Sequence, residues 1–177
     1  MNEINEIINS VLKLINNQNF NEALTILNKN TKEDYRIFFL KGSIFIALNQ
    51  LDLAEENLLK SLKLNNKNSS AFHNLANLYL KKKDLKSAKI NYLRAIEINN
   101  NILSLNELAY LLAEENNFIE AKKLYKKALE IDNQNKKANL GIGHLYLKLN
   151  YIQKGYNHIN SVNGVIRFSD KGFTIAS

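Results

Sequence analysis

Three histidines are the residues of this chain best able to do acid-base or metal chemistry, because a neutral imidazole accepts protons and ligates transition metals. They stand in the segments His73-Asn74-Leu75, His144-Leu145-Tyr146 and His158-Ile159-Asn160. None has an acidic residue at the His-x-Asp or Glu-x-x-His spacing of metal and general-base sites. We therefore expect no metal, no cofactor and no catalytic residue, and we interpret His73 and His144 as polar surface residues or as hydrogen-bonded histidines.

Other motifs of enzymes are missing from the sequence. It has no Gly-x-Ser-x-Gly nucleophile elbow and no glycine-rich phosphate loop, since the pair Gly141 and Gly143 falls inside a segment of helical periodicity. We interpret these two glycines as close-packing positions. The absence of cysteine removes disulfides, thiolate catalysis and cysteine-ligated metals. The sequence predicts a protein without catalytic activity.

Small residues recur along the chain at a nearly constant interval. Ala23, Ala54, Ala88 and Ala121 are 31, 34 and 33 residues apart, and Gly155 follows after another 34. A period of this length is typical of stacked helical repeats. Apolar residues within each copy recur at three- and four-residue steps, which places them on one face of a helix. Each repeat is therefore predicted to be two antiparallel helices that cross closely at the small residue.

The third and fourth copies carry the fullest pattern. They read Ala71-Phe72, Leu75-Ala76, Tyr79, Asp84-Leu85, Ala88, Tyr92 and Ala95-Ile96, then Leu105, Leu108-Ala109, Leu112, Asn117-Phe118, Ala121, Tyr125 and Ala128-Leu129. These residues resemble the tetratricopeptide repeat. The resemblance implies an all-α, right-handed superhelix of about ten helices over residues 1–163. It divides the array into repeats at about 4–34, 35–68, 69–101, 102–135 and 136–163, of which the first and last are the least regular.

In this family the first helix of each repeat lines a concave groove, which holds a peptide or a helix of a partner protein. The resemblance implies the same role here, and this chain would be a protein-interaction scaffold. Asn77 and Asn106 would either bond to a peptide main chain or face water. Carried over by alignment position, the predicted groove residues are Arg36, Phe39, Ser43, His73, Asn77, Lys81, Asn106, Tyr110, Leu140 and His144.

Asparagine marks the predicted helix ends. The chain has no proline, and the proline that usually closes the repeat is replaced by Asn66, Asn100 and Asn133. Asparagine tolerates left-handed backbone angles and bonds to nearby main chain, so it ends a helix without a proline. A capping residue followed three positions later by an acid predicts helix starts. This spacing occurs at Asn19 and Glu22, at Thr31 and Asp34, and at Asn117 and Glu120.

The net charge of +7 raises the question of nucleic acid as a partner. Lysine outnumbers arginine 21 to 3, and we attribute this and the abundant asparagine and isoleucine to an AT-rich genome. The lysines gather mainly in the second helices and the links, where a solvated outer face is expected. Nucleic-acid binding through this face is a disfavoured alternative, since glutamates interrupt the lysines and arginine is scarce.

Residues 164–177 depart from the helical pattern. Two alternating runs, Val165 to Ser169 and Phe173 to Ile175, flank the segment Asp170-Lys171-Gly172. Alternation on both sides of a glycine-containing turn predicts a short β-hairpin or an extended arm, with Gly172 at a positive φ. Because an isolated hairpin is marginal in water, we expect it to lean on the last repeat as a cap, or else to recruit another chain.

Two further expectations concern location and assembly. The first residues are acidic, and no apolar run is long enough to span a membrane, so we expect a soluble, cytoplasmic protein without membrane contact. The leading function is a scaffold that holds a protein or peptide in its groove. The alternatives are a self-assembling protein, whose copies stack end to end as a homo-oligomer, and an accessory subunit of an enzyme or complex.

Overall fold

The computed structural model describes residues 3–30, 32–169 and 172–176, and these contain ten α-helices and two β-strands. The chain forms two compact units, Met1–Asn99 and Asn100–Ser177, which we call the N-terminal unit and the C-terminal unit. The N-terminal unit contains α1 (Glu3–Asn16), α2 (Phe20–Lys29), α3 (Tyr35–Ala47), α4 (Leu51–Leu64), α5 (Ser69–Lys81) and α6 (Leu85–Asn99). The C-terminal unit contains α7 (Ile102–Glu114), α8 (Phe118–Ile131), α9 (Lys136–Lys148), α10 (Ile152–Asn160), β1 (Val165–Ser169) and β2 (Gly172–Ala176).

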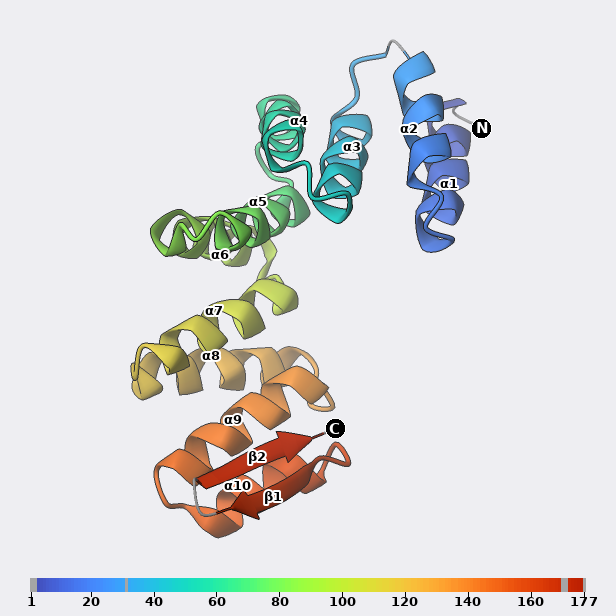
Figure 1. The fold of residues 1–177 in the computed structure, drawn as a ribbon. Helices are drawn as coiled ribbons and strands as arrows, with labels where there is room; N and C mark the ends of the chain where they lie inside the picture. The colour runs from blue at the N-terminus through green and yellow to red at the C-terminus, as the bar shows by residue number, and fades with distance from the viewer. Residues whose placement is uncertain (1–2, 31, 170–171, 177) are drawn as a thin grey trace. The chain divides into compact units, whose positions relative to one another are not determined.

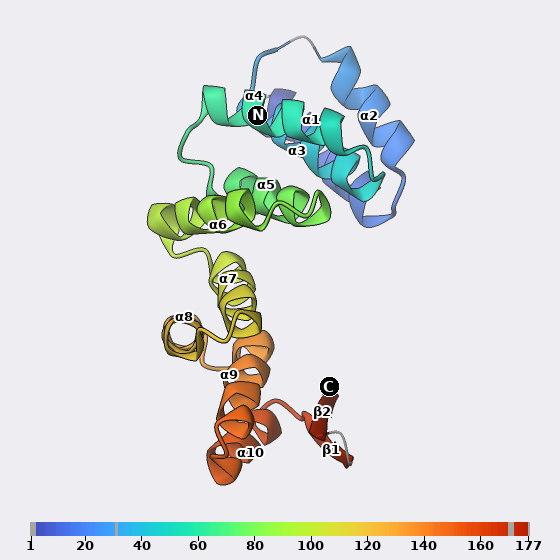
Figure 2. The same cartoon turned by 60° about the vertical axis from the view of Figure 1, so that its left-hand side comes forward.

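Each odd-numbered helix pairs with the helix that follows it, which gives the helix-turn-helix units of a solenoid (Figure 1). We call the odd-numbered helices A helices and the even-numbered ones B helices. Neighbouring A helices also touch, α1 with α3 and α3 with α5 in one unit and α7 with α9 in the other. Figure 2 shows α8 end-on beside α7 and α9, and α8 packs on both of them. The predicted all-α solenoid of about ten helices is thus confirmed.

The periodic small residues lie in the interior of the helix pairs. Ala23, Ala54, Ala88 and Ala121 are all 0% exposed, and Gly155 is buried. In the last pair a Cβ placed on Gly143 would lie 2.6 Å from Ile159 Cγ1 and 3.1 Å from the Gly155 carbonyl oxygen. Two helices approach this closely only where side chains are small. The backbones of α9 and α10 therefore pack against each other almost directly.

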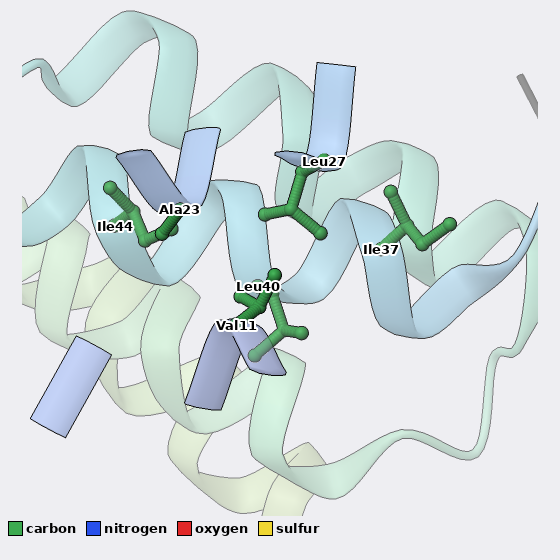
Figure 3. Packing of buried hydrophobic residues seen from close by; sticks show 6 residues of the cluster. All are labelled: Val11, Ala23, Leu27, Ile37, Leu40 and Ile44. Carbon is green, nitrogen blue, oxygen red and sulfur yellow. The ribbon is translucent and has the colours of Figure 1, made fainter. Parts of the chain in front are cut away.

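A compact apolar cluster holds the first three helices together. Val11 of α1, two residues of α2 and three of α3 are at most 5% exposed (Figure 3). These residues come from helix faces that repeat every three or four positions, as helical periodicity requires. Branched aliphatic side chains pack around one alanine here, which stabilises the otherwise irregular first repeat. The members of the cluster are Val11, Ala23, Leu27, Ile37, Leu40 and Ile44.

Shortly after the end of each A helix, one residue has a positive φ and so takes the left-handed backbone conformation. The N–H of this residue donates to the carbonyl three residues back, and the next N–H donates to the carbonyl five residues back, as in Asn116 to Ala113 and Asn117 to Leu112. This pattern satisfies two carbonyls at the helix end and turns the chain sharply into the B helix. The left-handed residues are Gln18 (φ 59°), Asn49 (φ 59°), Lys83 (φ 62°), Asn116 (φ 62°) and Asn150 (φ 62°).

Only some of the asparagines predicted to end or cap helices do so in the structure. Asn100 is left-handed, with a φ of 52°, whereas Asn66 and Asn133 are not among the residues with positive φ. The Asn117 side chain caps α8, since its Oδ1 accepts from the Glu120 N–H at 3.4 Å. Asn19 precedes α2 but makes no side-chain cap bond.

The helix start predicted at Thr31 is wrong. Helix α3 begins at Tyr35, and Asp34 is its cap, with Oδ1 accepting from the Arg36 N–H at 2.8 Å. The Arg36 guanidinium also binds the Asp34 carboxylate, which explains why the acid stands before this helix rather than inside its first turn. Thr31 itself lies outside the described residues.

The predicted C-terminal hairpin is present. Strands β1 and β2 pair antiparallel, with Arg167 opposite Thr174 and Ser169 opposite Gly172. Gly172 has a φ of 121°, as a tight turn requires of a glycine. Asp170 and Lys171, the other predicted turn residues, lie outside the described residues. Among the helices that the structure describes, none combines the length and apolar character needed to cross a membrane.

Candidate functional site

Three predicted groove residues of the C-terminal unit line one hollow. Tyr110 of α7 meets Leu140 and His144 of α9 around a cavity of about 230 Å³, which Lys137, Tyr125, Gly141 and Ile175 complete. Lys137, Leu140 and His144 follow one another at spacings of three and four residues, so they share one face of α9. Tyr110 is 50% exposed, so part of its ring is open to solvent beside the cavity. We call this place the α7–α9 hollow.

The floor of the α7–α9 hollow is made by a tight contact. Tyr125 of α8 is 3% exposed, and a Cβ on Gly141 would lie 2.2 Å from its ring carbon Cζ. Burial raises the pKa of the Tyr125 hydroxyl well above its ordinary value, so the group stays neutral. The missing side chain at position 141 thus admits the tyrosine ring beneath α9. The sequence named Gly141 as a packing glycine but did not identify Tyr125 as its partner.

His144 is a half-buried, neutral side chain in this hollow. Its ring lies edge-on to Phe173 of β2, with 5.3 Å between the ring centroids. Burial lowers the pKa of His144, and the Lys148 charge lowers it further, while Glu114 acts in the opposite direction. An uncharged imidazole here offers one donor and one acceptor to a ligand. Within residues 3–30, 32–169 and 172–176 no group of three or more metal-ligating side chains is found.

An ion pair borders the hollow between the two A helices. Lys137 of α9 binds the carboxylate of Glu107 of α7. The two residues are 30 positions apart, so the pair joins equivalent faces of successive repeats. Because Lys137 is more than half exposed, the pair adds little stability, but it holds a charged edge beside an apolar cavity.

Asn106 does not face the groove, contrary to the prediction. It is 1% exposed, and its Nδ2 donates to Oδ1 of Asn135 at 2.9 Å. The same Asn135 oxygen caps α9 by accepting from the Ala138 N–H at 3.0 Å. Asn106 therefore ties α7 to the start of α9. Its partner lies 29 residues further along the chain, and no local pattern reveals such a contact.

In the N-terminal unit, several predicted groove side chains bond to neighbouring A helices. Arg36 Nη1 donates to Asn5 Oδ1 of α1 at 2.7 Å. Ser43 Oγ accepts from Asn74 Nδ2 of α5 at 2.8 Å. Both contacts span 31 residues and link equivalent helix faces. These side chains position one A helix on the next, and a ligand would have to compete with them.

The Asn77 side chain is likewise engaged. The Tyr92 hydroxyl donates to Asn77 Oδ1, and Asn77 Nδ2 lies 3.0 Å from His73 Nε2. The His73 ring also lies against the Tyr92 ring, with 5.6 Å between the centroids. Asn77 is thus a half-buried link between α5 and α6 and not a free groove amide.

The two remaining predicted groove residues of this unit, Phe39 and Lys81, lie in different environments. Phe39 packs against the apolar clusters on both sides of α3, so its ring is largely part of the interior. Lys81 is exposed at the end of α5. The residues predicted for one groove therefore fall into two sets, one in each compact unit. The C-terminal set, without Asn106, gathers around a cavity.

The chain matches sequence models of one family. Models described as "Tetratricopeptide repeat" match residues 35–68, 69–102 and 112–162, which together make up more than half of the chain. No sequence of a curated protein matches it.

Solved structures show the same fold. The structure titled "Functional Characterization of Pseudomonas Aeruginosa pilF" is 15% identical, with a TM-score of 0.82 over 89% of this chain and 74% of that one. A crystal structure of MamA is 17% identical, with a TM-score of 0.71 over 85% of this chain and 90% of that one. YrrB, described as a tetratricopeptide protein with an unusual peptide-binding site, is 19% identical, with a TM-score of 0.65 over 88% and 82%. Sequence models, helix pairing and fold agree that this chain belongs to the tetratricopeptide repeat family.

Proposed function

We propose that this protein is a non-catalytic scaffold, which holds an extended peptide segment of a partner protein at the α7–α9 hollow. The observation that carries the proposal is the half-exposed Tyr110 ring beside a cavity lined by Leu140 and His144. Aromatic side chains that remain exposed next to a hollow are typical anchors of protein interfaces. Membership of the tetratricopeptide family supports an interaction scaffold in general.

The size of the hollow favours a peptide over a small molecule. At about 230 Å³ and open to solvent, it is smaller than the roughly 300–1,000 Å³ of most small-molecule sites. It is large enough to receive one or two apolar side chains. The neutral His144 and the Tyr110 hydroxyl can then bond to the main chain of the bound segment, which an extended peptide presents at regular intervals.

A catalytic role has little support at this site. His144 is the one histidine that lines the hollow, and the acidic side chain that acts on its pKa, Glu114, acts more weakly than burial does. An activated nucleophile needs a base that is oriented by a third group, and Tyr125 has its pKa raised, the opposite of activation. We therefore assign recognition and not chemistry to these residues.

Affinity capture with two matched variants tests the proposal. Tyr110→Ser removes the exposed anchor of the hollow, whereas Ile119→Ser removes an apolar side chain of α8 that is 82% exposed and does not line it. Both changes lie at exposed positions, so both variants should fold normally. We expect Tyr110→Ser to lose specific partners that wild type and Ile119→Ser retain. Equal recovery by all three proteins would refute the proposal.

The other partner predictions remain open to direct measurement. Several lysines are already engaged: Lys82 binds Asp52 and Glu55, and Lys122 Nζ lies 4.7 Å from the centroid of the Tyr146 ring. This supports the view that nucleic acid is not the partner, and a flat salt dependence of partner binding would agree with it. Self-assembly is tested by the molecular mass in solution. Cytoplasmic location stays a prediction from composition.

A further inference from the structure

The C-terminal hairpin presents two different faces. Ile166, Phe173 and Ile175 are partly buried, whereas Arg167 and Thr174 are exposed. Successive side chains of a strand point to opposite faces, so the buried set forms one inner face. The cross-strand partners Ile166 and Ile175 lie together on it. The hairpin is therefore docked on the helices through apolar side chains that alternate with polar ones.

The inner face of β2 enters the α7–α9 hollow. Ile175 lines the cavity together with Tyr110 and Leu140. Two residues earlier, the Phe173 ring lies against the His144 ring. Strand β2 runs beside α9 in Figure 1. An aromatic and an aliphatic side chain, two positions apart on an extended strand, thus occupy the surface that we assign to a partner.

The hairpin joins the helices through one fixed turn. Asn163 has a φ of 56°, and the Gly164 N–H donates to the Ile159 carbonyl at 2.9 Å. A Cβ on Gly164 would lie 2.6 Å from Ile159 Cγ2 and 2.8 Å from Leu140 Cδ2, so glycine is needed for this close approach. The turn thus holds Gly164, the residue before β1, against Leu140 of α9 and Ile159 of α10.

Beyond this turn the hairpin is weakly held. A two-stranded hairpin is marginal by itself, and the inner side chains of β2 are only partly buried. The contact of α9 with α10 lies elsewhere on the helix: Ile142 is 1% exposed and does not line the hollow, and Gly143 packs against Gly155 and Ile159 of α10. Detachment of the hairpin therefore exposes the hollow without opening the helix pair.

We propose that β2 is an internal ligand of the α7–α9 hollow, and that an extended partner segment displaces it. The segment would carry an aromatic and an aliphatic side chain two residues apart, matching Phe173 and Ile175. This inference rests on the proposed function, since it treats the hollow as the binding site. Only protein molecules with the hairpin detached can bind a partner segment. The tethered strand would therefore lower the apparent affinity for every ligand, and weak ligands would not bind measurably.

The test is a peptide-binding measurement on full-length variants. The probe is a fluorescent peptide with the sequence of residues 164–177, and its control has alanine in place of Phe173 and Ile175. The variant Phe173→Ala/Ile175→Ala vacates the hollow. The matched control Arg167→Ala/Thr174→Ala changes two facing residues on the outer side of the same hairpin. Binding is followed by fluorescence anisotropy.

We expect the vacated variant to bind the probe about ten to a hundred times more tightly than wild type or the matched control. This is the ratio if the hairpin is detached in about 1–10% of wild-type molecules. Adding Tyr110→Ser to the vacated variant should abolish the binding, and the alanine peptide should not bind. Equal affinity of wild type and the vacated variant would overturn the inference.

Hydrogen exchange on the wild-type protein decides the matter if the vacated variant does not fold. Exchange of the β2 amides at least about ten times faster than those of α9 would support a detachable ligand. If the amides of β2 and α9 instead exchange at the same rate, through one common opening, the hairpin is an integral part of the fold and the inference is overturned. If Tyr110→Ser loses captured partners while the probe binds no variant, the proposed function stands and the internal-ligand inference fails.

Discussion

The contact between Asn77 and Tyr92 gives a direct test of how the predicted groove residues are used. The Tyr92 hydroxyl donates to Asn77 Oδ1, and Tyr92 is 0% exposed. If Asn77 mainly supports the fold, its replacement should lower the free energy of unfolding. If it mainly faces a ligand, replacement should leave stability unchanged and affect binding alone.

The structure sets the expected magnitudes. Tyr92→Phe removes one hydrogen bond and keeps the ring, so the free energy of unfolding should fall by about 0.5–1.5 kcal/mol. Asn77→Ala deprives a buried hydroxyl of its acceptor, at a cost of about 1–3 kcal/mol, and alanine returns about 0.6 kcal/mol of helix propensity. A net loss of about 0.5–2.5 kcal/mol follows. The double variant should lose about 1 kcal/mol less than the sum of the single variants, because the second change removes nothing more from the pair.

Urea unfolding followed by circular dichroism at the helical minimum measures all four proteins. An unchanged dependence on urea concentration would show that the same surface unfolds in each. Ser87→Ala is a suitable control, since Ser87 donates its hydroxyl to Asp84 at the exposed start of α6. Single-variant losses that simply add, within about 0.3 kcal/mol, would refute the structural role of Asn77.

Three further predictions concern stability. Lys83→Gly should raise the free energy of unfolding by about 0.5 kcal/mol in urea titrations, because a lysine at a φ of 62° costs more than the extra chain entropy of glycine. Gly143→Ala should lower it by about 1–2 kcal/mol, since the new Cβ would lie 2.6 Å from Ile159 Cγ1 and overpacking outweighs the gain in helix propensity. Burial lowers the pKa values of His144 and His158 below 6.5, so as the pH falls the unfolded chain takes up protons before the folded chain does, and stability should fall as the pH drops through 6.5. Thermal melts at pH 7.5 and 5.5 check this. A variant with glutamine at both positions should show a smaller drop in melting temperature between the two pH values.

The repeating features of this fold could be predicted because each one reflects a local requirement. Ala88 and Ala121 are spaced by the repeat and are completely buried, since close helix crossings admit only small side chains. The hairpin followed from strict alternation around Gly172, which has the positive φ that its turn requires. The first pattern recurs after 33 residues and the second is confined to the hairpin, and both are present in the structure.

The binding surface was harder to predict, because the burial of a side chain depends on residues that are distant in the sequence. The alignment positions included Tyr110, Leu140 and His144, which line the α7–α9 hollow, but they also included Asn106, which is buried and bonded to Asn135. They could not include Ile175, which reaches the hollow from a segment outside the repeats. A periodic pattern determines the face of a helix on which a residue lies, whereas its exposure is decided by whatever packs there next.

The backbone conformation of the links after the B helices could not be predicted from the sequence either. Asn65 after α4 and Asp132 after α8 are extended, with φ of −144° and −142°, and an A helix follows each of them. Asn100 after α6 and Asn163 after α10 are instead left-handed. One of these lies at the boundary between the two compact units, and the other precedes the hairpin. Asparagine-rich segments that look alike in sequence thus take two conformations, both of which asparagine allows, so the sequence alone does not distinguish them.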